Sequence, residues 1–159
     1  MAKTMITEHF SLEEMTHSAY LDRINKNRKE PYTNIPNDGV MENLRVLCNN
    51  LEKIRNYLGM PLVISSGYRN EFVNYGVGGS RTSLHVQGAA ADISLTIDKI
   101  LPAAVFAMNL PCAREVFISA NAKGGTWLHF GVETTGTGCC RVGIDYNGKV
   151  KYALHYKSI

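Results

Sequence analysis

The stretch Ser83-Leu-His-Val-Gln-Gly-Ala-Ala-Ala-Asp92 organises the chain, because it places one imidazole and one carboxylate among small residues. Neutral imidazole and carboxylate oxygen are both good zinc ligands, and catalytic zinc commonly has three protein ligands and an open fourth position. The stretch therefore predicts two ligands, His85 and Asp92. The best candidate for the third is His129, because it lies in an apolar, aromatic run, Thr126-Trp-Leu-His-Phe-Gly-Val132, that is typical of a buried strand.

The length and composition indicate one globular domain. A chain of 159 residues can bury a core of its own, so we expect a single domain over residues 1–159. A net charge of +3 is too small to indicate a nucleic-acid partner. The 4 cysteines lack the C-x-x-C spacing of a thiolate zinc site, so we expect free thiols.

The amino terminus lacks the continuous apolar stretch of a signal peptide. No run of about 18 apolar residues is present to span a bilayer. We therefore expect a protein that is synthesised in the cytoplasm and does not insert into membranes. We also expect it to be a monomer. Any action outside the cell would then require release by lysis, a holin-type pore or assembly into a particle.

Three helices are predicted. The capping box Ser11-Leu-Glu-Glu14 should begin a helix of about two turns. Apolar residues from Val40 to Leu58 recur at steps of three and four, so they form one face of an amphipathic helix. Asp98 could cap a third helix over Lys99–Met108. Two segments rich in turn-forming residues are predicted as loops: residues 25–39 and 73–81.

The predicted strands are apolar or alternating runs bounded by turn signals. They are Pro61–Ser66, Asp92–Thr96, Val116–Ser119, Trp127–Val132, Arg141–Tyr146 and Lys149–Tyr156. The last two flank Asn147-Gly148, which is typical of a tight hairpin. Because helices come first and a mostly antiparallel set of strands follows, we expect an α+β fold with the helices packed on one side of the sheet.

Four features of the chain together resemble the M15 family of zinc peptidases, and more narrowly the M15A-type branch common in phage genomes. They are Ser66-Gly-Tyr-Arg69, Val77-Gly-Gly79, the Ser83–Asp92 stretch and Trp127-Leu-His129. The resemblance covers roughly residues 8–133. It implies a fold like that of Hedgehog and DD-peptidase domains. It also implies a Zn²⁺ cofactor and hydrolysis of bacterial peptidoglycan peptides, as in D-Ala-D-Ala carboxypeptidases and phage endolysins.

The resemblance also implies roles for individual residues. The implied zinc ligands are His85, Asp92 and His129. Arg69 would bind or polarise a carboxylate or carbonyl oxygen of the substrate, which suits the planar fork of a guanidinium. Ser83 would support the first histidine. Tyr68, beside Arg69, is expected either to line the substrate pocket or to lie in the core.

The general base is the part of the site that the sequence does not supply. Many M15 enzymes carry an acid three positions before the second histidine, where this chain has Thr126; in the phage-type branch the acid often ends the preceding strand, at Ser119 here. Glu115 is a candidate base, because it lies on the same face of its strand as Ser119. Its side chain would, however, start about 13 Å from that of Ser119 along the strand. Glu133 is an alternative.

A missing base typically costs about 10²- to 10⁴-fold in rate. Two hypotheses therefore stay open. The first is a zinc peptidase of the bacterial cell wall. The second is a catalytically weak or inactive module that uses zinc for stability and serves in binding or structure, for example in a virion.

Overall fold

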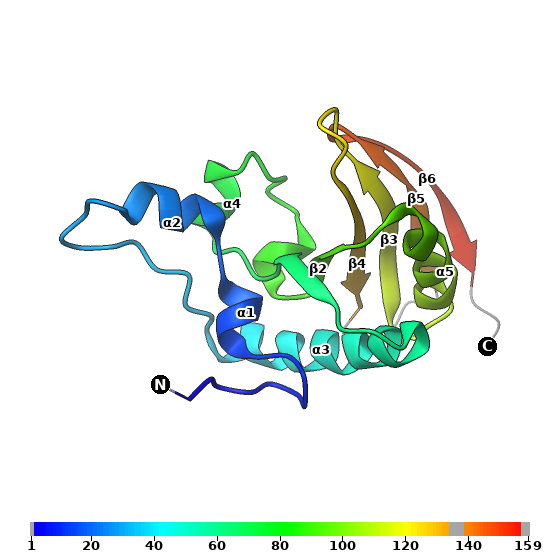
Figure 1. Cartoon of the computed structure of the whole chain (residues 1–159), viewed down its shortest axis with the longest axis horizontal. Helices are drawn as coiled ribbons and strands as arrows, with labels where there is room; N and C mark the ends of the chain where they lie inside the picture. Colours follow the sequence, from blue (N-terminus) through cyan, green and yellow to red (C-terminus); the bar gives the residue numbers. More distant parts are fainter. Residues whose placement is uncertain (1, 134–138, 157–159) are drawn as a thin grey trace.

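The computed structural model describes residues 2–133 and 139–156 (Figure 1). The helices are α1 (Leu12–Thr16), α2 (Ala19–Asn25), α3 (Asp38–Leu58), α4 (Glu71–Gly76), the 3-10 helix η1 (Leu84–Gln87) and α5 (Ile97–Met108). The strands are β1 (Val63–Ser66), β2 (Ala90–Ser94), β3 (Ala113–Ala120), β4 (Thr126–Val132), β5 (Cys139–Tyr146) and β6 (Lys149–Tyr156).

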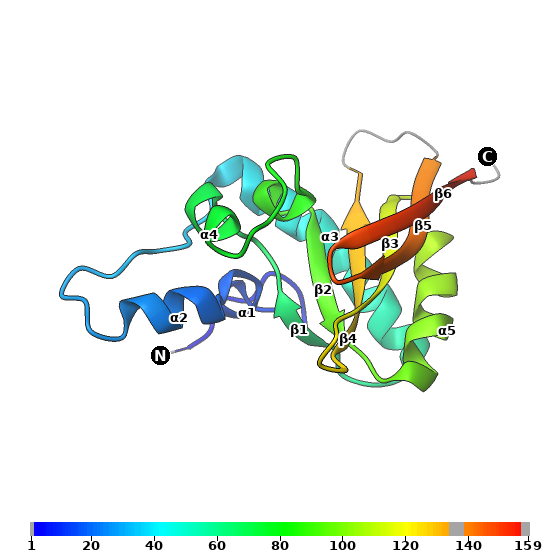
Figure 2. The same ribbon diagram turned by 90° about the horizontal axis from the view of Figure 1, so that it is seen from above.

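The strands form one sheet in the order β1-β2-β4-β3-β5-β6. Neighbouring strands in this sheet are antiparallel, except that β5 runs parallel to β3. Helices α3 and α5 contact each other and pack against the sheet (Figures 1 and 2). The predicted α+β fold with a mostly antiparallel sheet is therefore confirmed.

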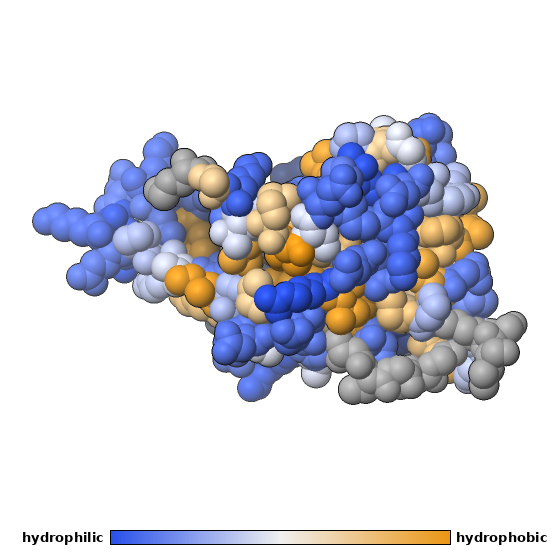
Figure 3. Space-filling model, turned by 90° about the horizontal axis from the view of Figure 1, so that it is seen from below, coloured by the Kyte–Doolittle hydropathy of each residue, from blue (hydrophilic) through white to orange (hydrophobic). Residues whose placement is uncertain are grey.

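Helix α3 is the long amphipathic helix that the apolar periodicity predicts. It begins two residues earlier than Val40, because the Asn37 side chain accepts a hydrogen bond from the Val40 amide and caps the helix. It ends at Gly59, which has the left-handed conformation (φ 64°) typical of a helix C-terminus. Its buried face includes Leu44 and Leu51. The face of the molecule seen from below carries hydrophilic residues around a smaller hydrophobic patch near its middle (Figure 3).

The amino-terminal helix is shorter than predicted. Ser11 caps α1 as expected, but α1 ends at Thr16 and a second helix, α2, begins at Ala19. The break arises because His17 and Ser18 are extended and the Ser18 hydroxyl accepts a hydrogen bond from the Leu21 amide, which starts a new helix. The loop that follows is anchored by buried Asn34, whose amide donates to the carbonyl oxygens of Thr16 and Tyr68.

Other boundaries differ from the prediction as well; for example, β3 extends over Ala113–Ala120 and not only Val116–Ser119. The predicted loop over residues 73–81 is wrong in its first part, because Asn70 caps α4 there. Strand β2 starts at Ala90, so Asp92 lies within the strand and not at its start. Asp98 is not the cap of α5; it lies in the first turn, and Thr96 precedes the helix.

Alternation along the strands gives the sheet two different faces. Ile93, Leu128 and Phe130 are buried in the core together with α3 and α5. The opposite face carries Asp92 and, on the neighbouring strand, His129 as its pairing partner. The predicted β5–β6 hairpin is confirmed. Among the described residues, no helix combines the length and apolar character needed to cross a membrane.

Candidate metal centre

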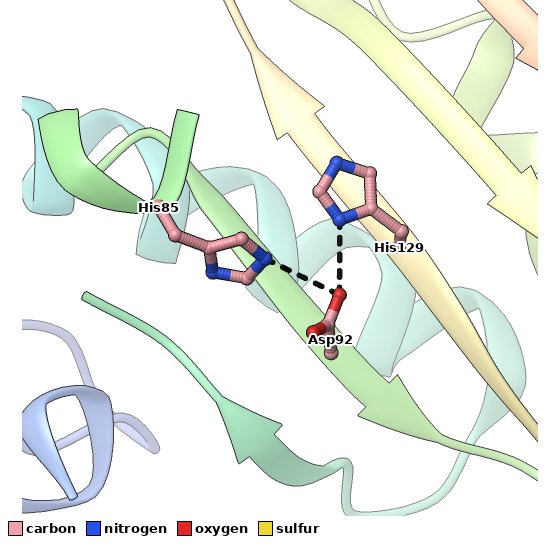
Figure 4. Close-up of side chains that lie close together, drawn as sticks. All are labelled: His85, Asp92 and His129. Carbon is pink, nitrogen blue, oxygen red and sulfur yellow. Dashed lines mark hydrogen bonds and ion pairs between the residues drawn. The ribbon is translucent and has the colours of Figure 1, made fainter. Parts of the chain in front are cut away.

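Three side chains from different parts of the chain converge on one face of the sheet (Figure 4). Asp92 comes from the middle of β2, His129 from the paired position on β4, and His85 from η1. Asp92 Oδ1 lies 3.4 Å from His85 Nε2 and 2.9 Å from His129 Nδ1. The ligand atoms all lie within 4.8 Å of one another. The structure thus brings together the three residues that the sequence singled out.

Hydrogen bonds on the outer side of each imidazole decide which nitrogen faces Asp92. His85 Nδ1 lies 2.7 Å from the carbonyl oxygen of Gly67, and His129 Nε2 lies 2.9 Å from Glu115 Oε2. When a metal ion takes the lone pairs on the Asp92 side, the Gly67 carbonyl oxygen and the Glu115 carboxylate can accept the ring protons on these outer nitrogens. The nitrogens that face Asp92, His85 Nε2 and His129 Nδ1, are the ones that would ligate a metal ion.

The electrostatics of the site favour a cation between these atoms. Burial lowers the pKa of His85, which keeps its imidazole neutral near pH 7. Burial alone would raise the pKa of Asp92, but the neighbouring His85 and His129 lower it below its ordinary value. An ionised Asp92 and a neutral His85 are the protonation states in which these side chains bind a metal ion.

The donor set fits a zinc-like metal ion. Zinc prefers tetrahedral coordination by nitrogen and oxygen at about 2.0–2.2 Å, which places neighbouring ligand atoms about 3.3 Å apart. The two separations from Asp92 Oδ1, 3.4 Å and 2.9 Å, are close to that value. His85, Asp92 and His129 could therefore hold a divalent metal ion.

Local structure explains why His85 points into the site. The Ser83 hydroxyl accepts a hydrogen bond from the His85 amide at the start of η1, and the His85 carbonyl oxygen accepts one from the Arg69 amide. Gly67 approaches α1 so closely that a Cβ atom there would overlap the carbonyl oxygen of Met15. The hydrogen bond between Arg69 and His85 thus joins the Ser66–Arg69 turn to the Ser83–Asp92 stretch and helps to fix the position of both.

A cavity of about 610 Å³ opens over the three residues. Arg69 lies in its wall, with one terminal nitrogen 3.5 Å from the Ser83 hydroxyl, so both predicted substrate-side residues reach the site. Burial lowers the pKa of Arg69, and nearby Asp92 counters this effect. The Arg69 Nε atom is buried without a hydrogen-bond partner among the described residues, which leaves a donor for a substrate oxygen.

Tyr68 is placed differently. It is 7% exposed, packs in the hydrophobic core and is not among the described residues that line the cavity. Its position matches the second of the two expectations for this residue, a place in the core. A role for Tyr68 in substrate binding stays a prediction.

The two positions at which the resemblance would place a base, Thr126 and Ser119, hold no carboxylate. Thr126 donates its hydroxyl proton to the Leu95 carbonyl oxygen at 2.8 Å. Ser119 is fully buried in the cavity wall. Glu133 lies beyond the end of β4 and pairs with Arg114 at 3.2 Å. Of the two acids that the sequence offers as a base, only Glu115 is among the described residues that line the cavity.

Glu115 reaches the site because the ring of His129 extends towards it. One oxygen accepts from His129 Nε2, and the other is paired with Arg141 from β5. Gly131, opposite Glu115 on β4, leaves the necessary space, because a Cβ atom there would lie 3.2 Å from the Glu115 Cβ. Sequence reasoning missed Arg141, because only the pairing of β5 with β3 brings it there. The role of Glu115 as base stays a prediction.

The fold and the site together define a candidate metalloprotein of the α+β class. Residues 8–112 match the family described as Peptidase M15, which is about two thirds of the chain. The chain therefore belongs to the peptidase M15 family. The match includes Arg69, His85 and Asp92 and ends before Glu115 and His129, which the structure adds to the site. No curated protein sequence matches the chain.

Proposed function

We propose that the chain is a zinc-dependent metallopeptidase that hydrolyses peptide bonds of bacterial peptidoglycan, as a carboxypeptidase or an endolysin. The observation that carries the proposal is the convergence of His85, Asp92 and His129 under one cavity, with each imidazole oriented by a hydrogen bond on its far side. Membership of the peptidase M15 family supports the same reaction class.

Zinc, when bound, would supply a water of lowered pKa and polarise the scissile carbonyl. The protein's own residues hold the reactants. Arg69 offers a fixed fork, with an unpaired Nε, to a carboxylate or carbonyl oxygen of the peptide. Phe117 stacks on His129 with ring centroids 5.5 Å apart and planes 12° apart, which restricts the histidine ring.

Glu115 has both oxygens engaged, by His129 and by Arg141. This arrangement supports a role in orienting the histidine. A metal-binding histidine commonly donates its outer N–H to a carboxylate, which fixes the tautomer and the ring orientation. Arg141 in turn restrains the carboxylate from the neighbouring strand.

A second candidate function rests on Thr126. Its hydroxyl donates a hydrogen bond to a backbone carbonyl oxygen, and Ser119 also lacks a carboxylate. Neither side chain can therefore act as a general base near pH 7. A zinc-stabilised binding or structural module, for example one associated with a virion, would keep this site and lack turnover.

For the setting of the reaction, we propose a monomer whose partner is a peptidoglycan peptide and not nucleic acid. The protein would reach the wall after release by lysis or through a holin pore, or within a phage particle. The small net charge of +3 gives no support to a nucleic-acid partner.

Hydrolysis of wall material by the zinc-loaded protein separates the two candidates. Cross-linked sacculi and soluble stem peptides are incubated with the protein, and the products are identified by mass spectrometry. The peptidase should release peptides, and chelator or His129→Ala should abolish release. His17→Ala changes a histidine that pairs with Asp22 on the surface and should have no effect. Stoichiometric zinc binding with intact substrate would favour the module.

A further inference from the structure

We propose that Asp145 and Ser119 form a subsite for an ammonium group, at the end of a diamino-acid side chain of the substrate peptide. The proposal rests on the peptidase function proposed above and specifies its substrate. Both residues lie outside the part of the chain that matches the family.

The sheet brings the two residues together. Strand β5 runs parallel to β3, which places Asp145 beside Ser119, and Ser119 in turn faces Trp127 on β4. All three side chains line the cavity that contains the metal ligands. The subsite and the metal centre therefore open to the same substrate.

The acceptors in this subsite lack partners. Asp145 Oδ1 and Ser119 Oγ are buried, and within the described part of the chain neither atom has a hydrogen-bond partner. Ser119 is 0% exposed. Buried acceptors without a donor are unfavourable, so a ligand that donates hydrogen bonds here would recover lost interactions.

The other carboxylates of the cavity are already engaged. Asp92 faces the two histidines, and Glu115 is held by His129 and Arg141. In contrast, Asp145 forms no ion pair with any residue that the structure describes. Among the carboxylates in the described cavity wall, that of Asp145 could thus accept hydrogen bonds from a ligand without losing an existing partner.

The chemistry of these groups selects a cation. A carboxylate accepts hydrogen bonds and carries negative charge, and the serine hydroxyl can also accept, whereas an ammonium group has three donors and no acceptor. The neighbouring Trp127 could add attraction through its ring face. An anionic ligand group would be repelled by Asp145 and would suit Arg69 instead.

The position of the subsite favours a long side chain over a role in proton transfer. Asp145 lies two strands and two residues away from His129, which corresponds to about 12 Å between their Cα atoms for a strand spacing of about 4.8 Å. A lysine-like side chain reaches about 6 Å from its Cα atom. A peptide with its scissile bond at the metal centre could therefore place a terminal amine of a nearby residue beside Asp145.

Binding of a small amine tests the subsite without turnover. Nα-acetyl-L-lysine amide is titrated into the zinc-loaded protein, and the fluorescence of Trp127, the 1 tryptophan of the chain, is recorded. We expect saturable binding of this probe to the wild-type protein. The affinity should be at least tenfold lower for the Nε-acetylated probe, and at least tenfold lower for the amine probe with Asp145→Asn. Asp22→Asn, which removes the same charge on α2, should bind like the wild type.

Ser119→Ala serves as a second variant, because it keeps the charge and removes one acceptor. It should weaken binding less than Asp145→Asn, and the melting temperature of each variant shows whether it is folded. Absence of saturable binding to the wild type, or equal affinities for the wild type and Asp145→Asn, would overturn the subsite.

Peptide hydrolysis gives a second readout. Asp145→Asn should raise KM for a lysine-containing peptide about tenfold or more and leave kcat and the acetyl-lysine peptide nearly unchanged. An equal fall in kcat for both peptides would assign Asp145 to proton transfer and overturn the proposal. Failure of the peptidase function would instead abolish hydrolysis in the wild type while leaving the fluorescence titration intact.

Discussion

Glu115→Gln should weaken zinc binding about 10- to 100-fold, the range typical for loss of a partner that orients a histidine ligand. The carboxylate of Glu115 receives two donors, one from His129 Nε2 and one from Arg141. The amide of glutamine has only one oxygen, so one of the two donors must lose its acceptor. A hydrogen bond to a charged group contributes about 1.5–3 kcal/mol, which corresponds to about 10- to 150-fold in an equilibrium constant.

The direction of the effect follows from the tautomer. If the glutamine oxygen stays with Arg141, its NH₂ group faces His129 Nε2, and that nitrogen must then accept. The ring proton would move to Nδ1, the nitrogen 2.9 Å from Asp92 Oδ1, where a metal would need a lone pair. Zinc binding would have to reverse this tautomer.

Competition with a chromogenic chelator measures the affinity, and circular dichroism checks folding. Glu133→Gln is the matched control, because Glu133 pairs with Arg114 and is not among the described residues lining the cavity. It should retain the wild-type affinity. An affinity of Glu115→Gln within twofold of the wild type would refute the orienting role.

Four further measurements address other parts of the structure. Chelation of zinc should lower the melting temperature, because a ligand at 1,000 times its Kd stabilises the native state by about 4 kcal/mol; coincident melting curves would contradict the metal site. Arg69→Lys should raise KM for wall peptides about tenfold, since an ammonium cannot replace the fork; unchanged kinetics would exclude substrate contact. Gly88→Ala should cost about 1–3 kcal/mol in urea unfolding, because Gly88 has φ 68° and its added Cβ would lie 2.7 Å from Val40 Cγ1. Burial raises the pKa of Cys48 to about 12, so native protein should resist alkylation of this thiol at pH 8, as read by mass spectrometry; rapid labelling would contradict its burial.

Local patterns in the sequence predicted those parts of the fold whose cause is local. The steps of three and four from Val40 to Leu58 specify α3, and Asn147-Gly148, both with positive φ, specifies the last hairpin. The sequence pattern does not predict the break between α1 and α2, which depends on Ser18 acting as a helix cap. Such caps compete with helix continuation, and the outcome depends on what the next turn contacts.

The convergence of His85, Asp92 and His129 was predictable because metal chemistry restricts the residue types and because the family resemblance joins distant motifs. Arg141 and Asp145 were not predictable in the same way. Period two indicates which residues of a strand share a face, but it does not indicate which strand lies alongside. Here β5 pairs in parallel with β3 and not with β4, the strand before it in the chain. That long-range pairing brings Arg141 to Glu115 and Asp145 to Ser119.

A zinc anomalous difference map from crystals of the zinc-loaded protein examines the proposed centre itself. We predict one strong peak within bonding distance of His85 Nε2, a carboxylate oxygen of Asp92 and His129 Nδ1. His129 Nε2 should remain hydrogen-bonded to Glu115. A peak at another place, or coordination of zinc through His129 Nε2, would contradict the metal centre described here.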